Sequence, residues 1–187
     1  PASIAEAAKM IMAAKRPVIY SGGGILRSRA ADELRTLAEM TDIPVVTTLM
    51  NRGGFPDDHE LNLGMPGMHG NYTAVMAMQE ADLLIALGAR FDDRVTGARD
   101  KFAPDAKVIH VDIDPAELGK VRFAHVPIAG DAKSIITEMI KEIEKLGGAD
   151  GQPDRDAWRQ TLSGWQEKYP LVYGDHEPGK LLKPQFV

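Results

Sequence analysis

Short apolar runs alternate with segments of helical periodicity over most of the chain. The apolar runs, which are typical of buried strands, cover residues 17–20, 43–47, 82–87, 107–113 and 126–128. Apolar residues recur at helical spacing over 2–15, 28–40, 71–80 and the segment that begins at Asp131. Strands that are apolar on both faces and alternate with helices predict an α/β fold, in which helices cover both faces of a parallel sheet.

The remaining segments suggest where the domain ends. Residues 48–70 are predicted to form a long glycine-rich loop, and loops of this length inside a compact domain are commonly functional. Residues 148–156 are interpreted as a linker, 156–168 as a helix and 170–187 as an extended tail. We therefore predict one domain over 1–147, followed over 148–187 by a linker, a short helix and a tail that leads to a further domain. The ends of the chain, at Pro1 and at Val187, are expected to lie within a longer polypeptide.

Composition narrows the class of protein. The chain has 187 residues, of which 44% are hydrophobic and 26% charged, as in an ordinary globular protein. Its net charge of -5 and lack of a basic run argue against a nucleic acid or an anionic membrane as partner. The absence of cysteine rules out a disulfide framework and a thiolate nucleophile, and it fits a cytoplasmic protein. No metal is expected in this chain, because its histidines, including His59, His110, His125 and His176, lack metal-ligand spacing.

The loop after the apolar run 82–87 carries the most distinctive chemistry. Residues 88–97 contain two glycines, two arginines and two aspartates within ten positions. Ligands of parallel α/β proteins bind at the carboxyl ends of the strands, and guanidinium groups suit an anionic, phosphate-bearing ligand. A solvated turn with internal ion pairs is the alternative interpretation of this segment.

Three other segments fall at comparable positions. Ser21-Gly22-Gly23-Gly24 lies between a strand and a helix, where glycines let backbone N–H groups approach a pyrophosphate, although Arg27 replaces the third glycine of the dinucleotide fingerprint. Asp112 ends a strand and could hydrogen-bond a ribose, whereas Asp114 is interpreted as the cap of the following turn. The loop Leu63–Gly70 contains two methionines and a histidine that could face a flat ring. No nucleophile or general base accompanies these segments, so they indicate a binding domain without catalytic residues of its own.

Taken together, these segments resemble the middle domain of the acetolactate synthase (acetohydroxyacid synthase) large subunit. The resemblance extends from about residue 1 to 147 and is most specific in Arg90-Phe91-Asp92-Asp93-Arg94-Val95-Thr96-Gly97. It implies a Rossmann-like, six-stranded parallel sheet in a transferase that condenses two 2-keto acids (pyruvate with pyruvate or 2-ketobutyrate) in branched-chain amino acid biosynthesis. That enzyme uses thiamine diphosphate and magnesium, and it also binds FAD, largely across this domain.

The resemblance also assigns site residues. FAD would contact Gly22, Gly23, Gly24, Thr48, Leu49, Gly67, Met68, His69, Gly88, Ala89, Arg90, Asp92, Arg94, Val95, Asp112, Ile113, Asp131 and Ala132. Arg94 would in addition hold the carboxylate of the second keto acid. Pro66 departs from the family pattern, which has leucine at this position.

The family's catalytic glutamate and its diphosphate–magnesium motif lie in domains outside this chain. The expected partners are therefore those N- and C-terminal domains, a second catalytic subunit in a homodimer or homotetramer, and a regulatory subunit. By itself the chain is expected to lack synthase activity. The alternatives are the middle domain of a related carboligase such as glyoxylate carboligase, a purely structural middle domain without FAD, or an NAD-binding module.

Overall fold

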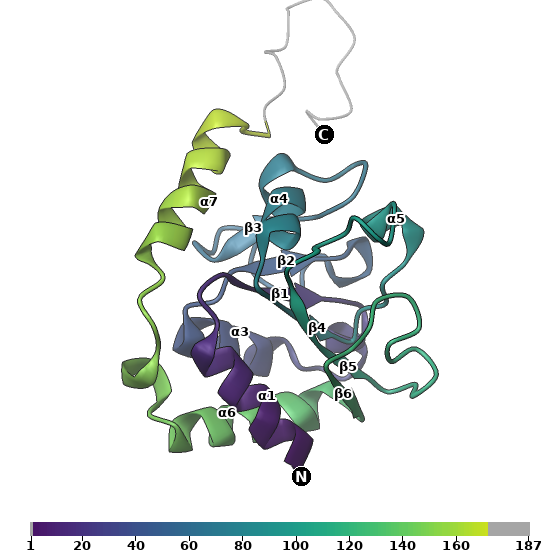
Figure 1. Cartoon of the computed structure of the whole chain (residues 1–187), viewed down its shortest axis with the longest axis vertical. Coiled ribbons are helices and arrows are strands. Elements are labelled where there is room, and N and C mark those ends of the chain that lie inside the picture. The colour runs from purple at the N-terminus through teal and green to yellow at the C-terminus, as the bar shows by residue number, and fades with distance from the viewer. Residues whose placement is uncertain (1, 172–187) are drawn as a thin grey trace, which may run out of the picture.

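The computed structural model describes residues 2–171 and is built around a single parallel sheet (Figure 1). The six strands lie in the order β3-β2-β1-β4-β5-β6, and every neighbouring pair is parallel. Their bounds are β1 Pro17–Ser21, β2 Val45–Thr47, β3 Asn62–Gly64, β4 Leu83–Leu87, β5 Lys107–Asp112 and β6 Val126–Ala129. The predicted six-stranded parallel α/β fold with helices on both faces is confirmed.

Helices cover both faces of this sheet. The longer ones are α1 Ala2–Ala13, α3 Ala31–Thr41, α4 Tyr72–Glu80, α6 Ala132–Lys145 and α7 Asp156–Lys168, and the shorter ones are α2 Gly24–Arg27, α5 Asp93–Thr96, η1 Leu49–Asn51 and η2 Gly148–Gly151. Side chains of α1, α3 and α6 form one apolar core with the sheet. Side chains of α4 and α7 form a second core on the opposite face. The all-buried pattern of β1 and β4 follows from their position between these two layers.

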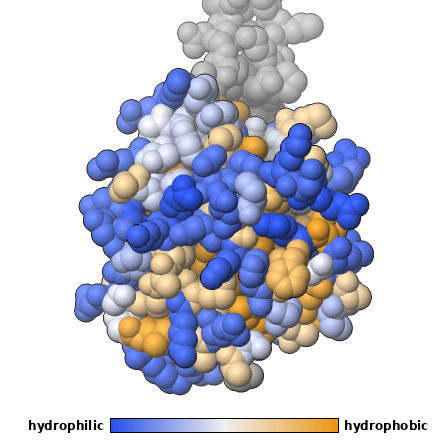
Figure 2. All heavy atoms as spheres, in the orientation of Figure 1, coloured by the Kyte–Doolittle hydropathy of each residue, from blue (hydrophilic) through white to orange (hydrophobic). Residues whose placement is uncertain are grey.

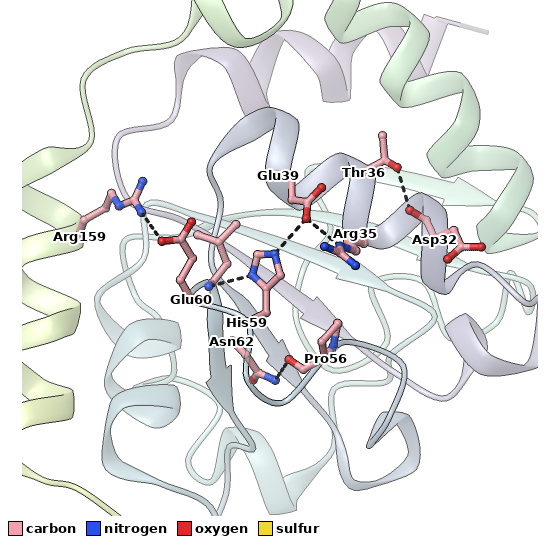
Figure 3. A network of polar contacts seen from close by, with 10 residues as sticks. Asp32, Arg35, Thr36, Glu39, Pro56, His59, Glu60, Asn62 and Arg159 are labelled. Carbon is pink, nitrogen blue, oxygen red and sulfur yellow. Dashed lines mark hydrogen bonds and ion pairs between the residues drawn. The ribbon is translucent and has the colours of Figure 1, made fainter.

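Strand β3 lies inside the segment predicted to be one long loop, so that prediction was wrong over Asn62–Gly64. The strand escaped notice because it has only three residues and a single apolar side chain, Leu63, which is buried in the second core. Polar contacts stabilise the turn that precedes β3 (Figure 3). Asn62 Nδ2 donates to Pro56 O at 2.7 Å, and His59 Nε2 lies 3.1 Å from Glu39 Oε1 on α3. Pairing of β3 with β2 then extends the sheet by one edge strand.

The helix predicted over 28–40 begins later than expected and is preceded by the separate helix α2. The chain turns at Arg29, whose φ of 55° lies in the left-handed region that interrupts a right-handed helix. Ser28 Oγ closes α2 by donating to Gly24 O at 2.7 Å. The other predicted elements agree with the structure to within two residues, and Asp131 caps α6 as expected by accepting from Ser134 N–H at 3.1 Å.

The segment after α6 returns to the domain and packs on it. Trp158 and Leu162 of α7 are buried in the second core, beside α4. Arg159 of α7 reaches Glu60, with Nη2 3.7 Å from Oε2 (Figure 3). The predicted extended tail lies outside the described residues from position 172 onward, as does His176.

The surface is mostly polar on the side drawn in Figure 2, where apolar residues show in smaller groups between hydrophilic ones. Among residues 2–171, no helix has the length and apolarity needed to cross a membrane. The same residues contain no group of three or more His, Cys, Asp or Glu side chains that could hold a metal ion.

Candidate functional site

A cavity of about 1420 Å³ lies at the carboxyl edge of the parallel sheet. Its walls come from the segments that follow β1, β2, β4, β5 and β6, together with the 65–69 loop and one side of α4. The carboxyl ends of parallel strands are where this class of fold binds ligands. At this volume the cavity exceeds the roughly 300–1,000 Å³ of ordinary small-molecule pockets, so it can take an extended ligand.

The residues assigned from the sequence all meet at this cavity. Its lining includes Gly22, Gly23, Gly24, Thr48, Leu49, Gly67, Met68, His69, Gly88, Ala89, Arg90, Asp92, Arg94, Val95, Asp112, Ile113, Asp131 and Ala132. These residues come from six segments that are far apart in the sequence, and the sheet order brings them together. The structure thus places them around one cavity.

Several lining residues could not be found by inspecting the loops. Tyr20 is the fourth residue of the buried strand β1, and Val75, Met78 and Gln79 project from α4. Strand and helix periodicity assign such residues to the core, so only the packing of α4 beside the cavity reveals them. Met65 and Pro66 also line the cavity, although the resemblance assigned neither of them to FAD.

The glycine-rich turn after β1 packs directly against the loop after β4. A Cβ atom on Gly22 would lie 2.2 Å from Gly88 O, and one on Gly24 would lie 2.6 Å from Gly88 Cα. Gly88 itself has a φ of +56° and would meet Gly24 Cα at 2.7 Å. Contact between the two backbones therefore explains Gly22, Gly24 and Gly88 without any ligand. Gly23 is less tightly packed, because its Cβ would come no closer to another atom than 3.2 Å from Met50 Cβ and 3.4 Å from Met50 O.

Positive charge at the cavity comes from three exposed arginines, Arg27, Arg90 and Arg94. Arg94 is the most clearly available, since its side chain is 80% exposed and its one carboxylate neighbour, Asp93, lies 3.8 Å away at the surface. Within residues 2–171, Arg27 and Arg90 form no ion pair. Exposed guanidinium groups that lack a carboxylate partner are suited to bind an anionic ligand.

Carboxylates gather at the far side of the cavity, after β5 and β6. Asp112 Oδ1 accepts from Asp114 N–H at 2.9 Å, and Asp114 Oδ1 accepts from Ala116 N–H at 2.9 Å. The interpretation of Asp114 as a turn cap is therefore confirmed. Asp131 caps α6, and Asp92 caps α5 in the same way, accepting from Arg94 N–H at 3.1 Å. The caps hold these carboxylates in fixed positions around the cavity.

One lining hydroxyl lacks a partner in the described part of the chain. Thr48 Oγ1 is buried and forms no hydrogen bond, although the Thr48 backbone is anchored by its N–H to Ser21 O at 2.9 Å. The next turn is held by Asn51, whose Nδ2 donates to Ser21 Oγ at 2.9 Å. A buried polar atom without a partner is unusual in a folded protein. At the wall of a cavity, it is a candidate for hydrogen bonding to a ligand.

Two titratable side chains lie beneath the loop after β4. Burial lowers the pKa of His110 and so favours a neutral ring, and the 3.0 Å contact of its Nε2 with Ala89 O assigns the proton to Nε2. Burial, with a smaller contribution from Asp92, raises the pKa of Tyr20, so its hydroxyl stays protonated and donates to Arg90 O at 3.3 Å. Both groups are therefore neutral hydrogen-bond donors.

The lowered pKa of His110 predicts acid-sensitive stability. In the unfolded chain His110 titrates near its ordinary value of about 6.5, so on acidification the unfolded chain takes up the proton before the folded chain does. The free energy of unfolding should hold above that pH and decline below it. Urea midpoints measured from about pH 5 to pH 8 should decline less in His110→Gln than in wild type. An equal decline would assign the dependence to other groups, such as His125, whose pKa burial also lowers.

The sequence of this chain matches a known protein family and is similar to several known proteins. Residues 4–139 match the profile of the family described as the thiamine pyrophosphate enzyme central domain. The chain is 58% identical over 184 residues to an acetolactate synthase of Mycobacterium avium, covering 98% of this chain and 29% of that protein. It is 54% identical, with the same coverage, to the acetolactate synthase large subunit of Corynebacterium glutamicum. A probable acetolactate synthase large subunit of Methanocaldococcus jannaschii is 46% identical over 99% of this chain and 30% of that protein.

The chain thus spans less than a third of the length of these relatives. The matched region, residues 4–139, contains the whole sheet and all of the segments that line the cavity. This match covers well over half of the chain and agrees with the parallel α/β architecture. The chain therefore belongs to the family of thiamine pyrophosphate enzyme central domains.

Proposed function

We propose that this chain is the FAD-binding central domain of an acetolactate synthase large subunit. The observation that carries the proposal is the cavity of about 1420 Å³ at the carboxyl edge of the sheet, which every residue assigned to FAD lines. High identity to acetolactate synthases over nearly the whole chain supports the choice of enzyme. The complete enzyme would condense two 2-keto acids, pyruvate with pyruvate or 2-ketobutyrate.

The residues present fit FAD. The volume of the cavity is sufficient for a dinucleotide. The exposed guanidinium groups of Arg90 and Arg94 can bind an anionic group. Gly23 lies at the wall of the cavity, and the unpartnered Thr48 Oγ1 offers a hydrogen bond. Asp112 and Asp131 stand at the opposite end, where carboxylates suit ribose hydroxyls.

FAD would be held by the glycine turn and the 88–95 loop at its diphosphate and ribityl region, with Met68 and His69 beside the flavin. Since the condensation involves no net oxidation or reduction, the bound flavin would supply no electrons to the overall reaction. Arg94, with its exposed guanidinium, would bind the carboxylate of the second keto acid.

Thiamine diphosphate, magnesium and the catalytic glutamate would be supplied by the neighbouring domains of a cytoplasmic enzyme. A second catalytic subunit would complete the active site, and a regulatory subunit would associate with the assembly. The isolated chain would consequently have no synthase activity, while keeping the walls of the FAD cavity.

Titration of the chain with FAD, with NAD in parallel, tests the proposal. Flavin fluorescence and calorimetry would monitor the titration. We expect FAD to bind saturably and NAD to show no comparable binding. Arg90→Ala should weaken FAD binding at least about tenfold, because a charge-assisted hydrogen bond is worth roughly 1.5–3 kcal/mol. Arg35→Ala is the matched control, since Arg35 pairs with Glu39 on α3 at 2.7 Å and does not line the cavity.

Each outcome has a defined meaning. Preferential NAD binding would overturn the proposal, and so would failure of both the chain and the complete enzyme to bind FAD. Equal weakening by Arg90→Ala and Arg35→Ala would place the FAD site outside the 88–95 loop.

A further inference from the structure

Three successive carbonyls of the loop after β4 are each held by a different part of the fold. Gly88 O accepts from Gly24 N–H at 3.0 Å, in the turn after β1. Ala89 O faces His110 Nε2 of β5 at 3.0 Å, and Arg90 O accepts from Tyr20 Oη of β1 at 3.3 Å. The backbone of this loop is thereby fixed by elements that are 70 and 21 residues away in the sequence.

Fixing the carbonyls also fixes the N–H groups. No peptide bond in the described residues is cis, and in a trans peptide the C=O and the following N–H point in opposite directions. The Ala89 N–H therefore points away from the glycine turn, and the Arg90 N–H points away from His110. Within residues 2–171, neither N–H has a hydrogen-bond acceptor. Both residues line the cavity, so these N–H groups are candidate donors for a ligand there.

His110 itself does not line the cavity and is only 1% exposed. Its ring is packed edge-on against Phe91, with centroids 5.4 Å apart, and Phe91 in turn lies 5.6 Å from the Tyr20 ring. The Nδ1 atom of His110 is buried without a partner. The only hydrogen bond of this side chain within the described residues is thus the one to Ala89 O, which a core residue chosen for packing alone would not need.

We propose that His110, assisted by Tyr20, is a positioning residue for the FAD cavity. By holding Ala89 O against the sheet, His110 keeps the N–H of Arg90, in the same peptide, directed at a hydrogen-bond acceptor of the bound cofactor. Tyr20 holds the other end of Arg90 by donating to its carbonyl oxygen. The inference rests on the proposed function for the identity of the ligand. The ordering of the loop by His110 is independent of the ligand.

Substitutions at His110 test the inference with two readouts. His110→Leu removes the donor at similar size, whereas His110→Gln places an amide N–H near the position of Nε2. We expect His110→Leu to speed hydrogen–deuterium exchange of the 88–92 amides in the ligand-free chain and to weaken FAD binding about tenfold. In His110→Gln, the exchange rates of these amides and the FAD affinity should return most of the way to the wild-type values. Tyr20→Phe should also speed exchange and weaken FAD binding, but by less than His110→Leu.

A destabilised control separates positioning from general loss of stability. Ile109→Ala alters the neighbouring residue of β5 in the other core, so it should lower the melting temperature while leaving the 88–92 exchange pattern and the FAD affinity unchanged. Unchanged loop exchange in both His110→Leu and Tyr20→Phe would overturn the inference, whatever FAD does. Faster loop exchange with unaltered FAD affinity would overturn it as well and leave the proposed function intact. If wild type fails to bind FAD, the proposed function fails, and the exchange measurement alone decides the role of His110.

Discussion

Gly22→Ala is expected to destabilise the chain by about 3 kcal/mol or more. The new Cβ would lie 2.2 Å from Gly88 O and 2.5 Å from Ala89 Cα, both of them backbone atoms that cannot move aside as a side chain can. Relief would require the turn after β1 and the loop after β4 to separate. Urea unfolding followed by circular dichroism would measure the loss.

Gly23→Ala is the matched control for this prediction. Its Cβ would lie 3.2 Å from Met50 Cβ and 3.4 Å from Met50 O, so the turn at Met50 has to shift by only a few tenths of an ångström. Its cost should stay below about 1 kcal/mol. Similar urea midpoints for the two variants would show that the turn and the loop do not touch as described.

The contrast between these glycines shows what sequence reasoning could supply. The position of the glycine turn between a strand and a helix was predictable, and so was its place at the binding edge of the sheet. The reason for the glycines was only partly predictable, because Gly22 and Gly24 are required by contact with Gly88, which lies more than sixty positions along the chain. Such a contact follows from β1 and β4 being neighbours, and strand order is not visible in local patterns.

The same limit explains the residues that were missed. His110 and Tyr20 lie on buried strands, so their apolar surroundings predict core positions, and their partners Ala89 and Arg90 are identified only by the sheet order. Strand β3 was missed for a different reason, since three residues with one buried leucine produce no periodic signal. Long periodic elements such as α6 were predicted well because many side chains report the same face.

Arg155→Met is expected to lower the free energy of unfolding by about 3 kcal/mol, because it leaves backbone carbonyls at the ends of two helices without their hydrogen-bond donor. Arg155 is only 5% exposed, and its guanidinium donates to Ile11 O at 2.9 Å and to Ala14 O at 3.0 Å, at the end of α1. It also donates to Thr41 O at the end of α3 and to Gln152 Oε1. Burial lowers the pKa of Arg155, yet an arginine remains charged in a folded protein, which suits it to neutralise the negative ends of both helices.

Arg159→Ala is the control on the same helix. Arg159 pairs with Asp42 and Glu60, but its side chain is 42% exposed, and such ion pairs contribute at most about 1 kcal/mol. Arg155→Lys should recover little stability, because one ammonium group lacks the planar fork that reaches carbonyls on both helices. If Arg155→Met unfolds with the same urea midpoint as the wild-type chain, this assignment is wrong.

The fluorescence of Trp158 can show whether α7 separates from the domain before the rest of Arg155→Met unfolds. Its indole is buried at 4% exposure in the second core and its Nε1 donates to Pro17 O at 3.3 Å, so its fluorescence reports whether α7 is packed on the domain. If Arg155 chiefly anchors the returning segment, the fluorescence change in Arg155→Met should precede the loss of helical circular dichroism. If instead it joins α1 and α3 within one cooperative unit, both signals should shift together to lower urea. The second result is the one we expect, because three of the four groups that Arg155 contacts are carbonyls of α1 and α3 or the residue after α1. On that result the segment after α6, although predicted as a linker, would be an integral part of the fold that supports the cavity.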